Sequence, residues 1–124
     1  MEIKEITTAE ELRPLLSLRK ERVDLKFNPA VNYLGAYMNG RLVGVVGCQR
    51  LGHHLLCYKS AGVLPEYRKM GIYSLLWRAR EEMYNTGGDI VTAFCTDKSL
   101  PMFLAHGFRK VSERNGITFV KRNG

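Results

Sequence analysis

Residues 63–76 read VLPEYRKMGIYSLL, and this stretch decides how the rest of the chain is arranged. The run before it, LLCYKSAGV at residues 55–63, is rich in apolar and aromatic residues, as in a strand of a sheet. Pro65 ends that run because proline cannot donate a ladder hydrogen bond. After Gly71, apolar residues recur at helical spacing. The stretch therefore predicts a strand, a short basic turn and a helix.

The turn between this strand and this helix has the features of an anion-binding site. The first N–H groups of a helix have no partner within it, and the helix dipole places partial positive charge at the same end. Here these groups lie beside Arg68 and Lys69, and Gly71 lets a ligand approach the backbone closely. The alternative is a solvated turn that Gly71 merely caps. No GxxxxGK[ST] or GxGxxG occurs, which argues against a nucleotide triphosphatase or a dinucleotide oxidoreductase.

Composition indicates one domain, spanning residues 1–124, with 25% charged and 45% hydrophobic residues. The net charge of +7 favours anionic partners. A polyphosphorylated cofactor would satisfy part of this charge and a nucleic acid would satisfy it too, so charge alone does not choose between them. No apolar run approaches membrane-spanning length, and the N-terminus is polar and acidic. We therefore expect a cytoplasmic protein with no membrane partner.

The three cysteines, Cys48, Cys57 and Cys95, lie far apart and form no CxxC pair. This spacing predicts neither a zinc site nor a disulfide framework. All three lie in apolar runs that read as strands, so we expect them to be small buried hydrophobic residues. No metal site is predicted.

Periodicity and turn signals divide the whole chain into alternating strands and helices. The expected strands are residues 1–6, 31–38, 41–51, 55–63, 89–95, 108–113 and 117–121. The expected helices are residues 8–23, 71–86 and 98–106. Thr8 and Glu11 have the spacing of a capping box at the first helix, which Pro14 should displace or kink. Asn-Gly pairs at residues 39–40 and 115–116 predict two tight hairpins.

The strand, helix and strand over residues 55–95 imply a right-handed crossover and a parallel strand pair. The turns at residues 39–40, 52–54 and 115–116 favour antiparallel pairs among the other strands. The expected fold is thus α/β (α+β): a mixed, mostly antiparallel sheet of about seven strands, flanked by helices.

The basic turn resembles the acyl-CoA binding signature of the GCN5-related N-acetyltransferases, the GNAT superfamily. That signature is Arg or Gln, two residues, Gly, one residue, and Gly or Ala. RKMGIY matches it at Arg68 and Gly71, while Tyr73 replaces the last small residue. The Val-x-Pro-x-Tyr lead-in at residues 63–67 and FLAHGF at residues 103–108 also match the family. The resemblance covers the chain from about residue 31 to the C-terminus.

The resemblance implies that acetyl-CoA is the cofactor and that the strands at residues 55–63 and 89–95 splay apart around its pantetheine arm. Backbone groups of the first strand would then bond the pantetheine amides like an added strand. A bulge at Gly62 would point an N–H group at the thioester oxygen. The residues that the resemblance assigns to the cofactor are Ala61, Gly62, Val63, Arg68, Lys69, Met70, Gly71, Ile72, Tyr73, Ser74, Ser99 and Phe103.

The sequence departs from the family at the residues that transfer protons. The family often has a tyrosine acid where this chain has Phe103, and a glutamate base near the position of Cys57. The remaining candidates are Tyr58, His53, His54 and Cys57. A histidine titrates near neutrality, as a base should. The two histidines also fit a solvated turn, Tyr58 a pocket wall and Cys57 simple packing, and a chain of waters would need none of them.

The resemblance implies an N-acetyltransferase in which an amine attacks the thioester of acetyl-CoA directly. Residues 8–30 have room for one helix and a loop, so we expect an open acceptor side that admits a large or macromolecular amine. The alternative is a catalytically weak binding module of the same fold, or a nucleobase-modifying relative that acts on nucleic acid. The basic residues form no dense run with interleaved aromatics, so the enzyme is favoured.

Overall fold

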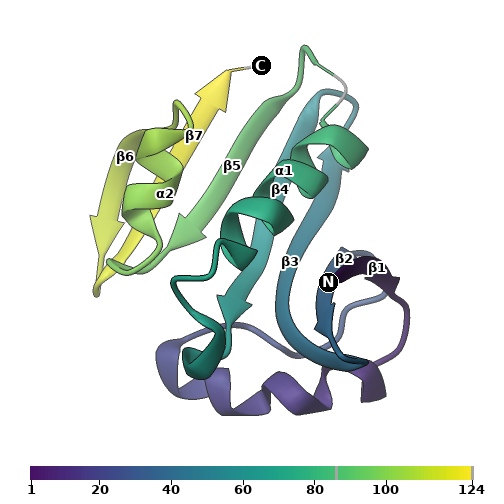
Figure 1. Cartoon of the computed structure of the whole chain (residues 1–124). Coiled ribbons are helices and arrows are strands. Elements are labelled where there is room, and N and C mark those ends of the chain that lie inside the picture. The colour runs from purple at the N-terminus through teal and green to yellow at the C-terminus, as the bar shows by residue number, and fades with distance from the viewer. Residues whose placement is uncertain (86, 124) are drawn as a thin grey trace.

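The computed structural model describes residues 1–85 and 87–123 and contains one seven-stranded sheet (Figure 1). Its strands are β1 (Glu2–Ile6), β2 (Asn32–Met38), β3 (Arg41–Gly52), β4 (Leu55–Val63), β5 (Ile90–Cys95), β6 (Arg109–Arg114) and β7 (Ile117–Asn123). They lie in the order β1-β2-β3-β4-β5-β7-β6. β4 and β5 are parallel, and the other neighbouring strands in this order are antiparallel. The predicted mixed sheet with a parallel β4/β5 pair is confirmed.

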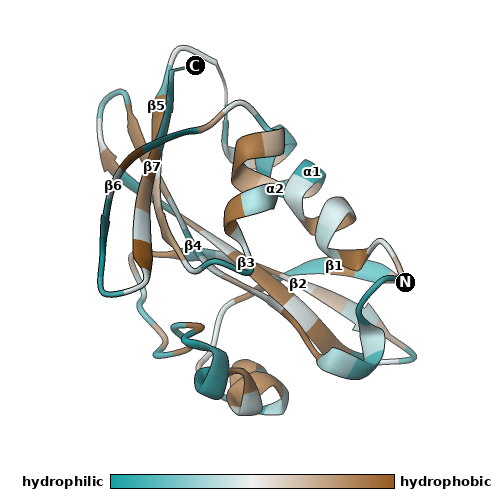
Figure 2. Cartoon of the chain, turned by 90° about the vertical axis from the view of Figure 1, so that its left-hand side faces the viewer, coloured by the Kyte–Doolittle hydropathy of each residue, from teal (hydrophilic) through white to brown (hydrophobic). Residues whose placement is uncertain are grey.

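Helices cover both faces of the sheet (Figure 2). The 3₁₀ helix η1 (Glu10–Glu21) lies on one face, and α1 (Ile72–Tyr84) and α2 (Leu100–Ala105) lie on the other. A short 3₁₀ turn, η2 (Pro65–Tyr67), connects β4 to the basic turn that precedes α1. Among the residues described, no helix is both long enough and apolar enough to cross a membrane.

The first helix has the predicted start but a different winding. The Thr8 N–H donates to Glu11 Oε1 at 3.1 Å and the Glu11 N–H donates to Thr8 Oγ1 at 3.4 Å, which is the expected capping box. The helix ends at Glu21, and Arg22 follows with φ 64°. It winds as a 3₁₀ helix around Pro14, which has no N–H to donate. Its buried residues Leu12, Leu15 and Leu18 recur every three residues, the period that places them on one stripe of a 3₁₀ helix.

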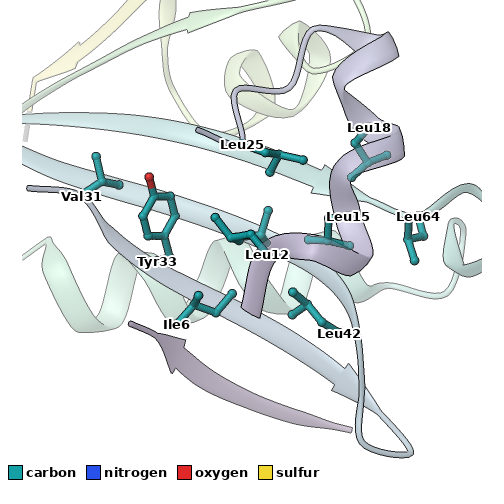
Figure 3. Packing of buried hydrophobic residues seen from close by; sticks show 10 residues of the cluster. Ile6, Leu12, Leu15, Leu18, Leu25, Val31, Tyr33, Leu42 and Leu64 are labelled. Carbon is teal, nitrogen blue, oxygen red and sulfur yellow. The ribbon is translucent and has the colours of Figure 1, made fainter. Parts of the chain in front are cut away.

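The leucine stripe of η1 packs on the face of the sheet opposite α1 and α2. Ile6 of β1, Leu42 of β3 and Leu64 belong to the same buried cluster (Figure 3). On the other face, Leu76 of α1 packs with buried residues of β2 and β3, and Trp77 packs with β4, β5 and α2. The sheet is therefore held between two apolar layers.

The remaining boundaries lie within a few residues of the predictions. α1 begins at Ile72, with Gly71 as its N-cap, and ends at Tyr84; Thr86, the predicted last residue, lies outside the described residues. α2 begins at Leu100, with Ser99 as its N-cap. The two Asn-Gly hairpins are present, with positive φ at both residues of each pair. The cysteines Cys48, Cys57 and Cys95 are buried free thiols.

Candidate functional site

A gap opens between the two parallel strands. β4 and β5 pair only from Leu55 and Ile90 to Tyr58 and Ala93. Beyond Tyr58, β4 continues to Val63 beside β3, whereas β5 follows β7, and the strands diverge (Figure 1). Residues 59–63 of β4 thus have no β5 partner, and the predicted splay is confirmed. Backbone groups on such an edge can bond an extended ligand as an added strand would.

A bulge distorts β4 beside this gap, but not at the predicted residue. Val45 of β3 pairs with Gly62 and Gly47 pairs with Lys59, so Ser60 and Ala61 together oppose a single residue of β3. Ser60 adopts φ 59° and takes up the extra length.

Gly62 pairs in register with Val45 of β3, and it must lack a side chain because η1 packs against it. A Cβ there would lie 2.9 Å from Leu18 Cδ1, so the glycine makes room for η1. The prediction of the bulge at Gly62 itself is therefore wrong, because packing against η1 and not backbone conformation requires this glycine.

The basic turn before α1 exposes its backbone. Lys69 and Gly71 adopt left-handed conformations, with φ 63° and 78°, and α1 starts directly after them. Among the described residues, no side chain caps this helix end, and apart from Gly71 and its chain neighbours no atom lies within 4 Å of the position that a Cβ of Gly71 would take. The first N–H groups of α1 thus have no side-chain cap and lie next to Lys69 in the chain, an arrangement that suits a phosphate.

Arg68, by contrast, has its charge already paired. Its Nε donates to the Val63 carbonyl at 2.9 Å, and its Nη2 donates to Glu21 at 2.7 Å. Lys98 Nζ donates to the other oxygen of Glu21 at 2.8 Å. The hydrogen bonds from Arg68 and then Lys98 lower the pKa of Glu21. Arg68 thus ties η1 to the end of β4, and only Lys69 of the two predicted cations is free of an ion pair within the described residues.

A cavity of about 690 Å³ joins the turn to the gap. Every predicted cofactor residue except Met70 lines it; the Met70 side chain is exposed outside it. The lining residues from the prediction are Ala61, Gly62, Val63, Arg68, Lys69, Gly71, Ile72, Tyr73, Ser74, Ser99 and Phe103. The basic turn before α1, the free edge of β4 and the start of α2 therefore line one and the same cavity.

The residues predicted to transfer protons are divided by the fold. Cys57 and Tyr58 line the cavity, whereas His53 and His54 do not. The histidines lie in the turn between β3 and β4, at the far end of β4 from Val63, where their rings pack against each other at 4.4 Å. Burial raises the pKa of the Cys57 thiol. Burial, and then the hydrogen bond to Glu81, raises the pKa of the Tyr58 hydroxyl, which donates to Glu81 at 2.8 Å.

Glu81 organises the buried wall behind Tyr58. Its carboxylate accepts two hydrogen bonds from Arg122, at 2.7 and 2.8 Å, and others from Tyr58, Trp77 and Asn85. Burial acts to raise the pKa of Glu81, but these donors outweigh it and lower the pKa to about 2. The network joins α1 to β4 and β7 and fixes one side of the cavity.

Several residues that line the cavity were not predicted, among them the charged residues Glu21, Asp24 and Arg80. The two carboxylates come from the end of η1 and the loop after it, a region in which the sequence shows no motif. Arg80 carried a signal, because it follows Ile72 and Leu76 at the four-residue spacing of the buried stripe of α1. An arginine at such a position has to be buried.

This arrangement can bind a ligand that carries a phosphate group at one end and an extended amide chain behind it. Phosphate oxygens suit the N–H groups of the turn, and amides suit the free edge of β4. Within residues 1–85 and 87–123, no three metal-binding side chains gather in one place.

Comparisons with known proteins agree with this geometry. The model of the acetyltransferase (GNAT) family matches residues 2–108. No curated protein sequence matches the chain significantly.

Many solved structures share the fold. A GNAT-family acetyltransferase from Staphylococcus aureus Mu50 is 19% identical, with a TM-score of 0.71, and the match covers 98% of this chain and 99% of that one. The PaiA N-acetyltransferase from Thermoplasma acidophilum, solved in complex with coenzyme A, is 13% identical over 100% of both chains, with a TM-score of 0.76. An acyl-CoA N-acyltransferase from Pseudomonas aeruginosa is 16% identical over 98% of this chain and 99% of that one, with a TM-score of 0.67. At these identities the structural likeness shows the fold alone.

Proposed function

The chain belongs to the acetyltransferase (GNAT) family, and on this basis we propose that it transfers an acetyl group from acetyl-CoA to an amine. The observation that carries the proposal is one cavity that joins the uncapped basic turn before α1 to the free edge of β4. This geometry matches the two parts of coenzyme A, a pyrophosphate and an amide-containing arm. The solved complex of the Thermoplasma acidophilum relative with coenzyme A supports the same cofactor.

In this proposal the pyrophosphate accepts hydrogen bonds from the N–H groups at the start of α1, beside Lys69 and Gly71. The pantetheine arm runs through the gap along residues 59–63 of β4. Ser99 and Phe103 of the α2 region line the other side of the arm. The thioester then lies toward Tyr58, where the gap closes.

The reaction is a direct displacement. The amine nitrogen attacks the thioester carbon, a C–N bond forms, and the C–S bond breaks to release coenzyme A. The bulge at Ser60 and Ala61 breaks the regular β3–β4 ladder and can direct an N–H group at the thioester oxygen. The proton of the amine passes to water or to a carboxylate at the open side. Cys57 and Tyr58 remain the candidates on the cavity wall for further proton transfer.

The acceptor enters from the face that η1 covers. This face holds one helix and the loop that follows it, as the sequence predicts, and Glu21 and Asp24 line the cavity there. Carboxylates at this position favour a cationic amine. We therefore infer an amine acceptor that approaches an open side, and a macromolecular amine fits this access.

Calorimetric titration with acetyl-CoA tests the proposal, with two glycine variants as a matched pair. Gly71 and Gly40 both have φ 78° and open space around the position of a Cβ, but Gly40 lies in the β2–β3 hairpin, outside the cavity. The Gly71→Val and Gly40→Val substitutions should lower the free energy of unfolding by similar amounts, because valine is strained in this conformation.

Only Gly71→Val should weaken acetyl-CoA binding, by about tenfold or more, because its side chain stands over the exposed N–H groups. If wild-type protein gives no heat with acetyl-CoA, or if the two variants bind it equally well, the proposal fails. Mass spectrometry of amines incubated with acetyl-CoA then identifies the acetylated product.

A further inference from the structure

Arg80 is a buried charge that has no carboxylate partner among the residues that the structure describes. Its side chain is 0% exposed, and its guanidinium stacks on the ring of Tyr58 at 3.8 Å and on that of Trp77 at 4.5 Å. Nη1 donates to the Gly47 carbonyl at 3.3 Å, but Nε and Nη2 have no hydrogen-bond partner among the described residues. An unpaired buried charge destabilises a folded protein strongly, so a fold rarely keeps one without a use for it.

The groups around Arg80 do not neutralise it. Those that face it are Tyr58 from β4, Cys48 from β3, and Tyr73 and Glu81 from α1 itself. The Glu81 carboxylate is held by Arg122. Burial raises the pKa of the Cys48 thiol to about 11, so this group is neutral at pH 7. Two N–H-bearing nitrogens of this buried guanidinium thus have no hydrogen-bond partner among the described residues.

Arg80 lies where the gap ends. Tyr58 is the last residue of β4 that pairs with β5, and the guanidinium lies over its ring. Arg80, Tyr73 and Phe103 all line the cavity, and the Tyr73 hydroxyl is also buried without a partner in the part of the chain that the structure describes. The inner end of the cavity therefore carries unused hydrogen-bond donors from one face of α1.

We propose that Arg80 holds the sulfur of coenzyme A as a thiolate when the C–S bond breaks. The inference rests on the proposed function and assigns to Arg80 the task that Phe103 cannot perform, since phenylalanine has no proton to donate. Arg80 follows Ile72 by eight residues, about 12 Å along the helix axis. A pantetheine arm that starts from the turn at the N-terminus of α1 can span this distance.

The step needs no further reactant. As the amine nitrogen forms its bond to the acyl carbon, the electron pair of the C–S bond moves to sulfur. The guanidinium charge and its free N–H groups stabilise that negative charge, and the thiolate takes a proton from water after coenzyme A leaves. A donor that is already in place in a dry site stabilises developing charge at no cost of reorganisation.

The direct test is the pKa of the coenzyme A thiol when bound, followed by ultraviolet absorbance of the thiolate as the pH rises. The same titration without coenzyme A removes the contribution of the cysteines of the protein. A free thiol titrates at about pH 8.5. With wild-type protein the bound thiol should titrate at least about one pH unit lower, because Arg80 favours the charged form.

Arg80→Met and the exposed neighbour Arg78→Met form the matched pair. With Arg80→Met the bound thiol should titrate at or above the free value, kcat should fall by about 100-fold, and KM for acetyl-CoA should stay within about threefold. Arg78→Met should behave as wild type.

The assignment is overturned if the bound thiol titrates alike in wild type and Arg80→Met, whatever the change in kcat, since packing alone explains such a loss. Should Arg80→Met not fold, the wild-type titration decides by itself, because a bound thiol at or above the free value overturns the assignment. If coenzyme A binds to neither protein, the proposed function fails as well, and calorimetry distinguishes that outcome.

Discussion

Replacement of Glu81 by glutamine should make the protein less stable at neutral pH but not in strong acid. The Glu81 carboxylate accepts hydrogen bonds from Arg122, Tyr58, Trp77 and Asn85, and its side chain is 22% exposed. Glutamine keeps the shape but loses the charge, and it leaves Arg122 without its ion pair. A buried pair broken in this way costs several kcal/mol.

The magnitude follows from the pKa of Glu81. The folded protein holds this pKa at about 2, against an ordinary value of 4.5. Each pKa unit corresponds to about 1.4 kcal/mol, so the carboxylate contributes about 3 kcal/mol to the free energy of unfolding. Because the folded pKa is the lower one, this stability is fully present above about pH 4.5 and is lost as the pH falls toward 2.

Urea unfolding of wild type and Glu81→Gln at several pH values between 2 and 7 measures the effect. The difference in unfolding free energy should be about 3 kcal/mol at pH 7 and should approach zero near pH 2. The exposed neighbour Glu82 supplies the control, and Glu82→Gln should follow wild type at every pH. A Glu81→Gln curve that stays parallel to that of wild type would show that the network does not hold the pKa down.

Two further variants test the walls of the cavity. Glu21→Gln should tighten acetyl-CoA binding by about two- to fivefold at low salt, because it releases the two cations that Glu21 pairs, whereas Glu10→Gln on the same helix should not. Equal calorimetric affinities for both variants would contradict this. Gly62→Ala should lower the unfolding free energy by about 1 kcal/mol, because its Cβ would lie 2.9 Å from Leu18, and Gly52→Ala, with ordinary contacts, should not. Urea unfolding that ranks the two alanine variants in the opposite order would refute the packing role of Gly62.

The sequence predicts the fold well because its signals are local. The Asn-Gly pairs set two hairpins, and the strand, turn and helix around Gly71 set the crossover and the parallel pair. The basic turn before α1 could be predicted for the same reason, since its backbone conformation depends on residues next to one another. The three-residue spacing of Leu12, Leu15 and Leu18 also indicates the 3₁₀ winding of η1. The Thr8 capping box and Pro14 had instead led us to expect a helix that Pro14 displaces or kinks.

The chemistry of the site was harder to predict because its contacts join distant parts of the chain. The partner of Arg68 is Glu21, which lies 47 residues away, so the charge of this signature arginine appeared free. The four-residue spacing of Arg80 after Leu76 indicates that it is buried, but only the structure shows that its guanidinium stacks on Tyr58 and Trp77. Side-chain pairs of this kind leave no pattern in a single sequence.

A crystal structure of the protein with coenzyme A is the most direct test of the central claim, that the gap between β4 and β5 and the turn before α1 form one cofactor site. We expect the pyrophosphate on the N–H groups beside Lys69 and Gly71, the pantetheine arm along residues 59–63 of β4, and the sulfur within hydrogen-bonding distance of Arg80. Coenzyme A bound elsewhere, or strands β4 and β5 paired along their whole length, would contradict the account.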